Sequence, residues 1–111
     1  MSGQPSTPGS FDVASSASDG TVTVTLRGEL DLASIDALQE RLTDVEQGSP
    51  RRIVLDLSGL SFIDSSGLRV LLLADGRARE SGCELLLTQS TEAVQRVFEM
   101  TGARDLLRFQ P

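Results

Sequence analysis

The first half of the chain changes from a strand-like to a helix-like pattern near Ser34. Residues 21–26 alternate strictly between threonines and apolar residues, which is the period of a half-buried strand that Gly28 would end. Residues 11–14 predict a short edge strand, so that the two strands form a β-hairpin around a Ser-rich turn through Asp19-Gly20. From Ser34 the apolar spacing becomes helical, and residues 48–50 (Gly-Ser-Pro) close this helix; its stripe is Ile35, Leu38, Leu42 and Val45.

The second half predicts two more strands, each followed by a helix. Residues 52–57 are apolar on both faces, as in a central strand covered on both sides and parallel to a neighbour. After a short loop, residues 65–81 predict a helix whose second half is weakened by Asp75, which falls within its apolar stripe of Leu68, Leu71, Leu72 and Ala78. Residues 84–88 predict a buried strand, and Thr91 is a good N-cap for a third helix that Gly102 ends; its stripe is Val94, Val97, Phe98 and Thr101.

The order of these elements predicts one α/β domain. With residues 106–109 as a short terminal strand, the order is β-β-α-β-α-β-α-(β), a mixed sheet of four to five strands with helices packed against it. The domain is expected over residues 11–111, after a Pro/Gly/Ser/Thr-rich and disordered tail at residues 1–10. Because no run is apolar enough for a membrane helix or a signal peptide, we expect a cytoplasmic protein.

Composition and charge exclude several functions. The net charge is -6, so a nucleic-acid backbone and an anionic membrane surface would both be repelled. Histidine is absent and Cys83 is the only cysteine, which excludes an internal disulfide, a His/Cys zinc site and a catalytic triad with a His base. The serines at positions 65 and 66 lack the flanking glycines of a nucleophile elbow. The sequence therefore predicts neither an enzyme nor a bound metal or cofactor.

The most unusual local chemistry is the run Asp64-Ser65-Ser66-Gly67 at the expected start of the second helix. All three polar side chains are of types that cap the free N–H groups of a helix start, and this structural explanation accounts for the run when it is considered alone. Asp31 follows the second strand at the same end of the predicted sheet, where it could also lie near Ser65 or simply cap the first helix.

Three stretches together resemble the anti-sigma factor antagonist family of small STAS domains. They are residues 28–31 (GELD), residues 57–68 (LSGLSFIDSSGL) and residues 93–102 (AVQRVFEMTG), and the similarity extends over about residues 11–109. The resemblance implies that the unphosphorylated protein binds an anti-sigma factor, which is also its serine kinase, and so frees a sigma factor. It further implies that Ser65 is the phosphorylated residue, that a serine phosphatase resets the switch, and that ATP and Mg²⁺ belong to the kinase. An alternative is a STAS adaptor with another partner, in a lipid-transport complex or a stress-sensing assembly.

The resemblance and the positions of residues relative to Ser65 together give a set of expected partner-binding residues. A phosphate there would add about -1.5 to -2 of charge at a helix N-terminus and spoil an interface without refolding the domain. Val70 and Leu73 lie opposite the apolar stripe and are open to packing within the domain or burial against a partner, and Arg69 either is solvated or steers towards an acidic partner. We expect a monomer whose partner-binding residues are Asp31, Asp64, Ser66, Gly67, Arg69, Val70 and Leu73.

Overall fold

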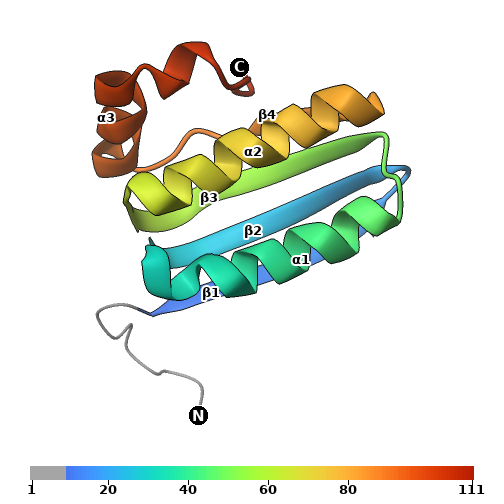
Figure 1. The fold of residues 1–111 in the computed structure, drawn as a ribbon, viewed down its shortest axis with the longest axis horizontal. Helices are drawn as coiled ribbons and strands as arrows, with labels where there is room; N and C mark the ends of the chain where they lie inside the picture. Colours follow the sequence, from blue (N-terminus) through green and yellow to red (C-terminus); the bar gives the residue numbers. More distant parts are fainter. Residues whose placement is uncertain (1–9) are drawn as a thin grey trace.

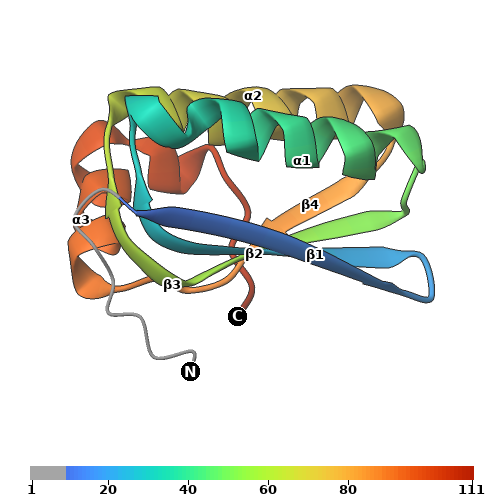
Figure 2. The ribbon, with the colours of Figure 1, turned by 90° about the horizontal axis from the view of Figure 1, so that it is seen from below.

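The computed structural model describes residues 10–111, and the tail predicted for residues 1–10 lies outside them except for Ser10. One sheet has the strand order β1-β2-β3-β4; β1 pairs antiparallel to β2, whereas β2–β3 and β3–β4 are parallel. Helices α1 and α2 cover one face of the sheet, and α3 stands at the end where α2 begins (Figures 1 and 2). The elements are β1 Phe11–Ser18, β2 Thr21–Leu30, α1 Ile35–Gln47, β3 Arg52–Ile63, α2 Ser65–Ser81, β4 Glu84–Leu87 and α3 Glu92–Thr101, with 3₁₀ turns η1 Leu32–Ser34 and η2 Ala103–Asp105.

The predicted hairpin is confirmed, but both of its strands are longer than the sequence pattern indicated. β1 continues to Ser18, so the turn consists of Asp19 and Gly20 alone. Gly28 does not end β2, and the strand continues to Leu30 through a register shift beside Gly28. Gly28 has a φ of 91°, and a Cβ at this position would clash with the carbonyl oxygen of Ser10. The glycine therefore forms a bulge inside the strand, where the sequence pattern suggested a strand end.

The same extension removes the short loop expected after residue 57. β3 runs to Ile63 because the added residues of β2 supply a partner for its second half, up to the pair Leu30↔Ile63. The sequence pattern did not indicate this half of the strand because it contains Ser58, Gly59 and Ser61, and small residues of these types are typical of turns. Its apolar positions complete the core under α1 and α2, with Leu57, Leu60 and Ile63 all buried.

α2 is one continuous helix. Asp75, the residue that weakened the prediction of its second half, forms an ion pair. Asp75 is only 7% exposed. Its Oδ2 accepts a hydrogen bond from Arg79 Nε at 2.7 Å, and Arg79 Nη2 donates another to the carbonyl oxygen of Leu106 at 3.3 Å. Asp75 can lie on the apolar side of α2 because Arg79, one helical turn later, balances its charge. Arg79 also connects Asp75 to the C-terminal segment.

The C-terminal segment closes the β4 side of the sheet. The strand predicted for residues 106–109 is reduced to one bridge between Leu87 and Phe109, which is supported by hydrogen bonds from Leu87 N to Arg108 O (2.8 Å) and from Gln110 N to Leu87 O (2.7 Å). The ring of Phe109 packs edge-on against Phe98 of α3, with 5.3 Å between the ring centroids. Across residues 10–111, every helix is too short or too polar to cross a membrane.

Candidate functional site

The site lies where β2 and β3 end side by side. Because the two strands are parallel, their carboxyl ends meet at one edge of the sheet, and Asp31 and Asp64 each follow the last residue of a strand. Asp64 N donates a hydrogen bond to the carbonyl oxygen of Leu30 at 3.1 Å, which fixes the start of α2 against the end of β2. This end of the sheet is on the left in Figure 1. The expectation that Asp31 lies at the same end as Ser65 is thus confirmed.

Asp64 is the cap of α2. Its Oδ1 accepts hydrogen bonds from Gly67 N at 2.9 Å and from Ser66 Oγ at 2.6 Å. Burial by itself would raise the pKa of Asp64, but the bonds from Ser66 and Gly67, with a further one from the Leu32 backbone, lower it below its ordinary value. Asp64 is therefore a carboxylate at neutral pH, and the first turn of α2 depends on it.

Ser65 differs from its neighbour Ser66 in having a free hydroxyl. Ser66 Oγ donates to Asp64, whereas the Ser65 side chain is exposed and forms no hydrogen bond with any of residues 10–111. Ser65 is the first residue of α2, where the helix dipole and the free N–H groups favour an added negative charge. Of the two serines, Ser65 can thus be modified without breaking a bond that holds the helix start.

Asp31 has a capping role, which was one of the two interpretations left open by the sequence. Its Oδ1 accepts hydrogen bonds from Ala33 N and Ser34 Oγ, both at 3.1 Å, and its own N–H donates to Ser34 Oγ at 2.9 Å. These reciprocal bonds form a capping box at η1. The box holds the loop after β2 in place beside the start of α2.

Gly67 allows α2 to approach β2 closely. It is buried, and a Cβ here would lie 2.7 Å from Leu30 Cγ and 3.0 Å from Leu30 O. A contact below 3.0 Å requires something to move, so glycine sets the distance between the helix start and the end of β2. Gly67 therefore positions Ser65, and its own atoms are not part of the exposed surface.

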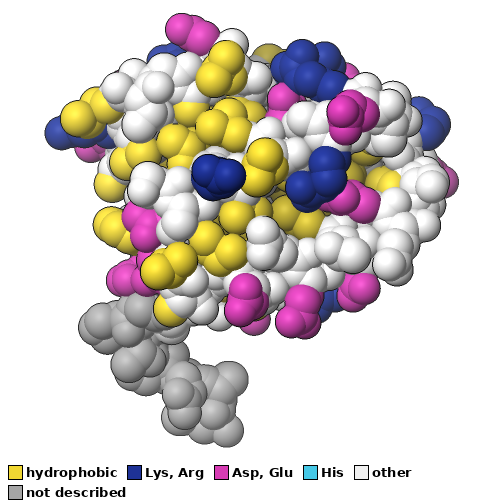
Figure 3. All heavy atoms as spheres, viewed as in Figure 1, with side chains coloured by type: hydrophobic (Ala, Val, Ile, Leu, Met, Phe, Trp, Pro, Cys, Tyr) yellow, Lys and Arg dark blue, Asp and Glu magenta, His cyan; other side chains and the backbone are white. Residues whose placement is uncertain are grey.

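The other expected partner-binding residues divide between core and surface. Val70 is 4% exposed and belongs to the core, so packing within the domain accounts for it. Leu73 is 48% exposed, and Arg69 is exposed without an ion pair among residues 10–111. Figure 3 shows hydrophobic side chains along the middle of the face formed by α1 and α2, with charged side chains among and around them. Leu73 and Arg69 therefore remain available for a partner.

The sequence analysis missed two exposed apolar residues near the Asp64 cap. Leu32 is 76% exposed, and its backbone contacts Asp64. Phe62 is 46% exposed and precedes the Asp64 cap by two positions. Neither belongs to a periodic stripe, because Leu32 lies in a short 3₁₀ turn and Phe62 follows a register shift in β3. Large exposed apolar side chains of this kind are candidates for contact with a protein partner.

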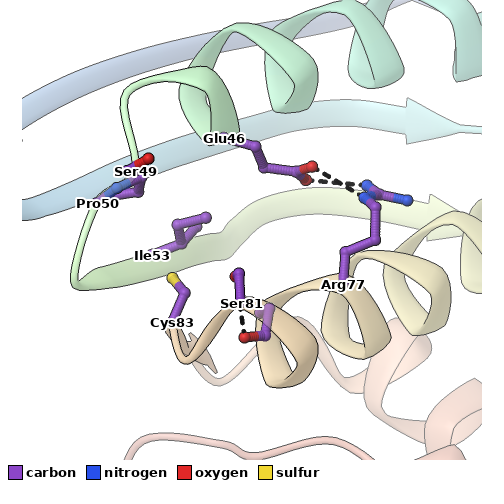
Figure 4. A pocket seen from close by; sticks show the side chains of 8 residues that line it. Glu46, Ser49, Pro50, Ile53, Arg77, Ser81 and Cys83 are labelled. Atoms are coloured by element: carbon purple, nitrogen blue, oxygen red, sulfur yellow. Dashed lines mark hydrogen bonds and ion pairs between the residues drawn. The ribbon is translucent and has the colours of Figure 1, made fainter.

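A pocket of about 230 Å³ lies at the other end of α2 and is not part of this site. Figure 4 shows the Glu46–Arg77 ion pair across it, with Nε–Oε1 and Nη2–Oε2 distances of 2.9 Å, and the Cys83 thiol on its wall. Burial raises the pKa of Cys83 most, and the nearby negative charge of Glu46 raises it further. At neutral pH this favours the protonated and less nucleophilic form of the thiol.

A four-stranded mixed sheet covered by two helices, with a serine at the exposed start of the second helix, defines a small α/β domain of the STAS type. The structure of an anti-sigma factor antagonist from Mycobacterium paratuberculosis has the same fold, with a TM-score of 0.87 and 26% identity, over 96% of this chain and 91% of that one. The STAS domain family model matches residues 12–111, and the chain belongs to this family.

Two curated relatives have names that state the same activity. BtrV of Bordetella bronchiseptica, which carries the name of an anti-sigma factor antagonist, is 37% identical over 84 residues, which are 76% of this chain and 72% of that protein. The anti-sigma-B factor antagonist of Staphylococcus aureus is 29% identical over 97 residues, which are 87% of this chain and 90% of that protein. These relatives are matched over most of their length, so the likeness concerns whole proteins.

Proposed function

We propose that this protein is an anti-sigma factor antagonist: its unphosphorylated form binds an anti-sigma factor and so releases a sigma factor. The family, and relatives named for this activity that match along most of their length, support the proposal. It acts as a regulatory binding protein and not as an enzyme. The observation that carries the proposal is the free Ser65 hydroxyl, exposed at the start of α2 beside a cap that does not need it.

Phosphorylation of Ser65 is the proposed off-switch. The phosphate adds about -1.5 to -2 of charge at pH 7. The N-terminus of α2 favours this charge by roughly 0.3–1 kcal/mol, whereas the neighbouring Asp64 carboxylate opposes it. Because Asp64 already caps the helix, the new group has no structural bond to displace. The fold is therefore expected to stay as it is, while a partner surface shaped for a neutral hydroxyl meets added bulk and charge.

The proposed contact surface is drawn from three segments near the start of α2. Asp31 and Leu32 come from the loop after β2, Phe62 from the end of β3, and Arg69 and Leu73 from the outer side of α2. Apolar side chains supply buried area, and the charged residues around them fix the orientation of the partner. Asp64 and Ser66 contribute through the cap that presents Ser65. Gly67 and Val70 act from beneath this surface.

The partners follow from the same proposal. The anti-sigma factor is also the serine kinase and brings ATP and Mg²⁺, and a separate serine phosphatase restores the free hydroxyl. All of these steps take place in the cytoplasm, where sigma factors act. The antagonist itself then needs only a surface and one modifiable residue.

Binding measurements on charge variants test the switch. Ser65→Ala should bind the anti-sigma factor encoded in the same genome with unchanged affinity, and Ser65→Asp should bind at least about tenfold more weakly, which is about 1.4 kcal/mol. Gln47→Glu, at the far end of α1, adds the same charge and is the matched control that should bind normally. Raising the salt concentration should recover part of the loss. Equal affinities of folded Ser65→Ala and Ser65→Asp would refute the electrostatic switch.

Mass spectrometry tests the modified residue. Incubated with that kinase and ATP, the protein should gain one phosphate that maps to Ser65. Ser65→Ala should gain none, whereas Ser66→Ala, which loses only the hydrogen bond to Asp64, should still be labelled. A phosphate found on Ser66 or Ser58 contradicts the assignment. A protein from native cells that never carries phosphate would favour the STAS adaptor instead.

A further inference from the structure

The two edges of the sheet are protected to different degrees. The β4 edge is short, and the C-terminal segment bonds to Leu87 on its outer side. β1, at the other edge, is eight residues long, and within residues 10–111 no segment pairs with its outer side. β1 also pairs with β2 without a bulge, contains no proline and has Asp12 as its single charge. Natural sheets normally protect an edge strand with devices of this kind, and β1 has only the charge of Asp12, so its backbone groups are open to pairing with another strand.

The hydrogen-bond register shows which groups of β1 are free. Glu29 N donates to Ser10 O at 2.9 Å, and this pair continues the antiparallel register of β1 and β2. Hydrogen-bonded and non-bonded pairs alternate along such a ladder, so the even-numbered residues of β1 face β2. The odd-numbered residues therefore direct their N–H and C=O groups outwards; they are Phe11, Val13, Ser15 and Ala17.

We propose that β1 pairs antiparallel with β1 of a second copy of this chain, so that the two sheets join into one of eight strands. Residues that pair across the two copies of β1 point to the same face of the sheet, and residues of equal parity in one strand share a face. A two-fold axis perpendicular to the sheet therefore keeps both α1 helices on one face only if the numbers of paired residues add up to an even number. With Ala14 on the axis, Val13 pairs with Ser15 and Phe11 with Ala17, and all four outward-facing residues are bonded. Asp12 then lies opposite Ser16, so no like charges meet along the ladder.

The charges on α1 favour a second copy over another occupant. Arg41 is the only basic residue of α1, and its Nη1 lies 3.5 Å from Ser15 Oγ, which places it over the β1 edge. The exposed positions of the same helix carry the acidic residues Asp36, Glu40 and Asp44. When the two edges meet, each Arg41 approaches the acidic α1 of the other copy. A self-complementary arrangement of this kind is what a two-fold interface requires.

The proposed dimer differs from the monomer expected from the sequence. Periodicity predicted only residues 11–14 as a strand, and an edge of four residues would not support a stable pairing. One strand pair and one helix contact form a smaller interface than the ~1,600 Å² of a standard stable complex, so we expect dissociation within the micromolar to millimolar range. The pairing uses β1 and α1, and it does not depend on the proposed role of Ser65.

Sedimentation equilibrium of the full chain between about 10 μM and about 1 mM tests the pairing. We expect a monomer–dimer equilibrium that Ala14→Lys weakens at least about tenfold, because two ammonium groups then face each other across the axis. Ser16→Lys is the matched control on the same exposed face of β1, and it should retain or strengthen the dimer because it lies opposite Asp12. Arg41→Glu should weaken the dimer as well.

Hydrogen exchange separates the proposed dimer from other ways of covering the edge. In the dimer, the amides of Val13, Ser15 and Ala17 become protected as the protein concentration rises. A monomer at about 1 mM with these amides unprotected would refute the proposal. Protection of the same amides in a monomer would refute it too, and would show that the edge is covered within one chain. Equal dimerisation of Ala14→Lys and Ser16→Lys would place the interface elsewhere.

Discussion

Replacing Gly67 by alanine tests whether close packing positions the start of α2. The new Cβ would lie 2.7 Å from Leu30 Cγ, 3.0 Å from Leu30 O and 3.1 Å from Ile63 Cγ1. The carbonyl oxygen of Leu30 cannot give way freely, because it accepts the hydrogen bond from Asp64 N. The first turn of α2 must therefore move away from β2, and Ser65 and Ser66, which precede Gly67 in that turn, must move with it.

The expected free-energy cost follows from two opposing terms. Overpacking a buried site costs about 1–3 kcal/mol, whereas alanine in place of glycine within a helix gains up to about 1 kcal/mol. Gly76→Ala isolates the second term, because Gly76 is exposed in the same helix and a Cβ there meets no atom within 4 Å. Gly67→Ala should therefore be less stable than Gly76→Ala by about 1–3 kcal/mol, with Gly76→Ala slightly more stable than the parent protein.

Urea denaturation followed by circular dichroism measures this difference. A gap of about 1–3 kcal/mol also corresponds to a difference in Tm of at least about 4 °C for a domain of this size. Gly67→Ala should in addition bind the anti-sigma factor more weakly, since its Ser65 is displaced. If Gly67→Ala is as stable as Gly76→Ala, the contact with Leu30 is not restrictive and the argument about the helix start is wrong.

Three further variants test individual side chains. Hydrogen bonds lower the pKa of Asp64 in the folded protein. Its stabilising effect is therefore complete above the unfolded pKa of about 4 and is lost as the pH falls through the folded pKa. Asp64→Asn should flatten the pH dependence of stability against urea in that range. Arg79→Ala should cost about 1–3 kcal/mol by leaving buried Asp75 unpaired, whereas Asp75→Leu should cost less than about 1 kcal/mol; equal losses in thermal unfolding would contradict this. Cys83 should react with iodoacetamide at pH 7.5 much more slowly in the folded than in the urea-unfolded protein, since burial raises its pKa.

The sequence predicts the fold well wherever a single apolar period operates. The stripes of α1 and α3 and the alternation in β2 identify elements that the structure confirms. The prediction fails where pairing with a neighbour overrides local pattern. Residues 58–63 become strand because β2 supplies their partner, and β2 itself passes through Gly28 because a bulge at φ 91° accommodates the glycine. Neither effect is visible within a short window of sequence.

The site shows the same division between local chemistry and tertiary contacts. The sequence identified the types of residue that cap a helix, but which of them bonds depends on geometry, and the structure assigns the cap to Asp64. The burial of Val70 depends on packing against the core, and the exposure of Leu32 and Phe62 follows from irregular backbone. Such properties depend on elements distant in sequence, so that no periodicity could reveal them.

The division of roles among three consecutive residues fits the proposed switch. Asp64 caps the helix start and Ser66 Oγ donates to Asp64, whereas the Ser65 hydroxyl between them forms no hydrogen bond within residues 10–111. If Ser65 were the cap, a phosphate would remove a structural hydrogen bond and the domain would be destabilised whenever it was switched off. Because Asp64 caps the helix instead, the proposed phosphorylation of Ser65 is expected to act on the affinity for the partner and to leave the cap intact. The stability of the domain and its affinity for a partner can then change independently.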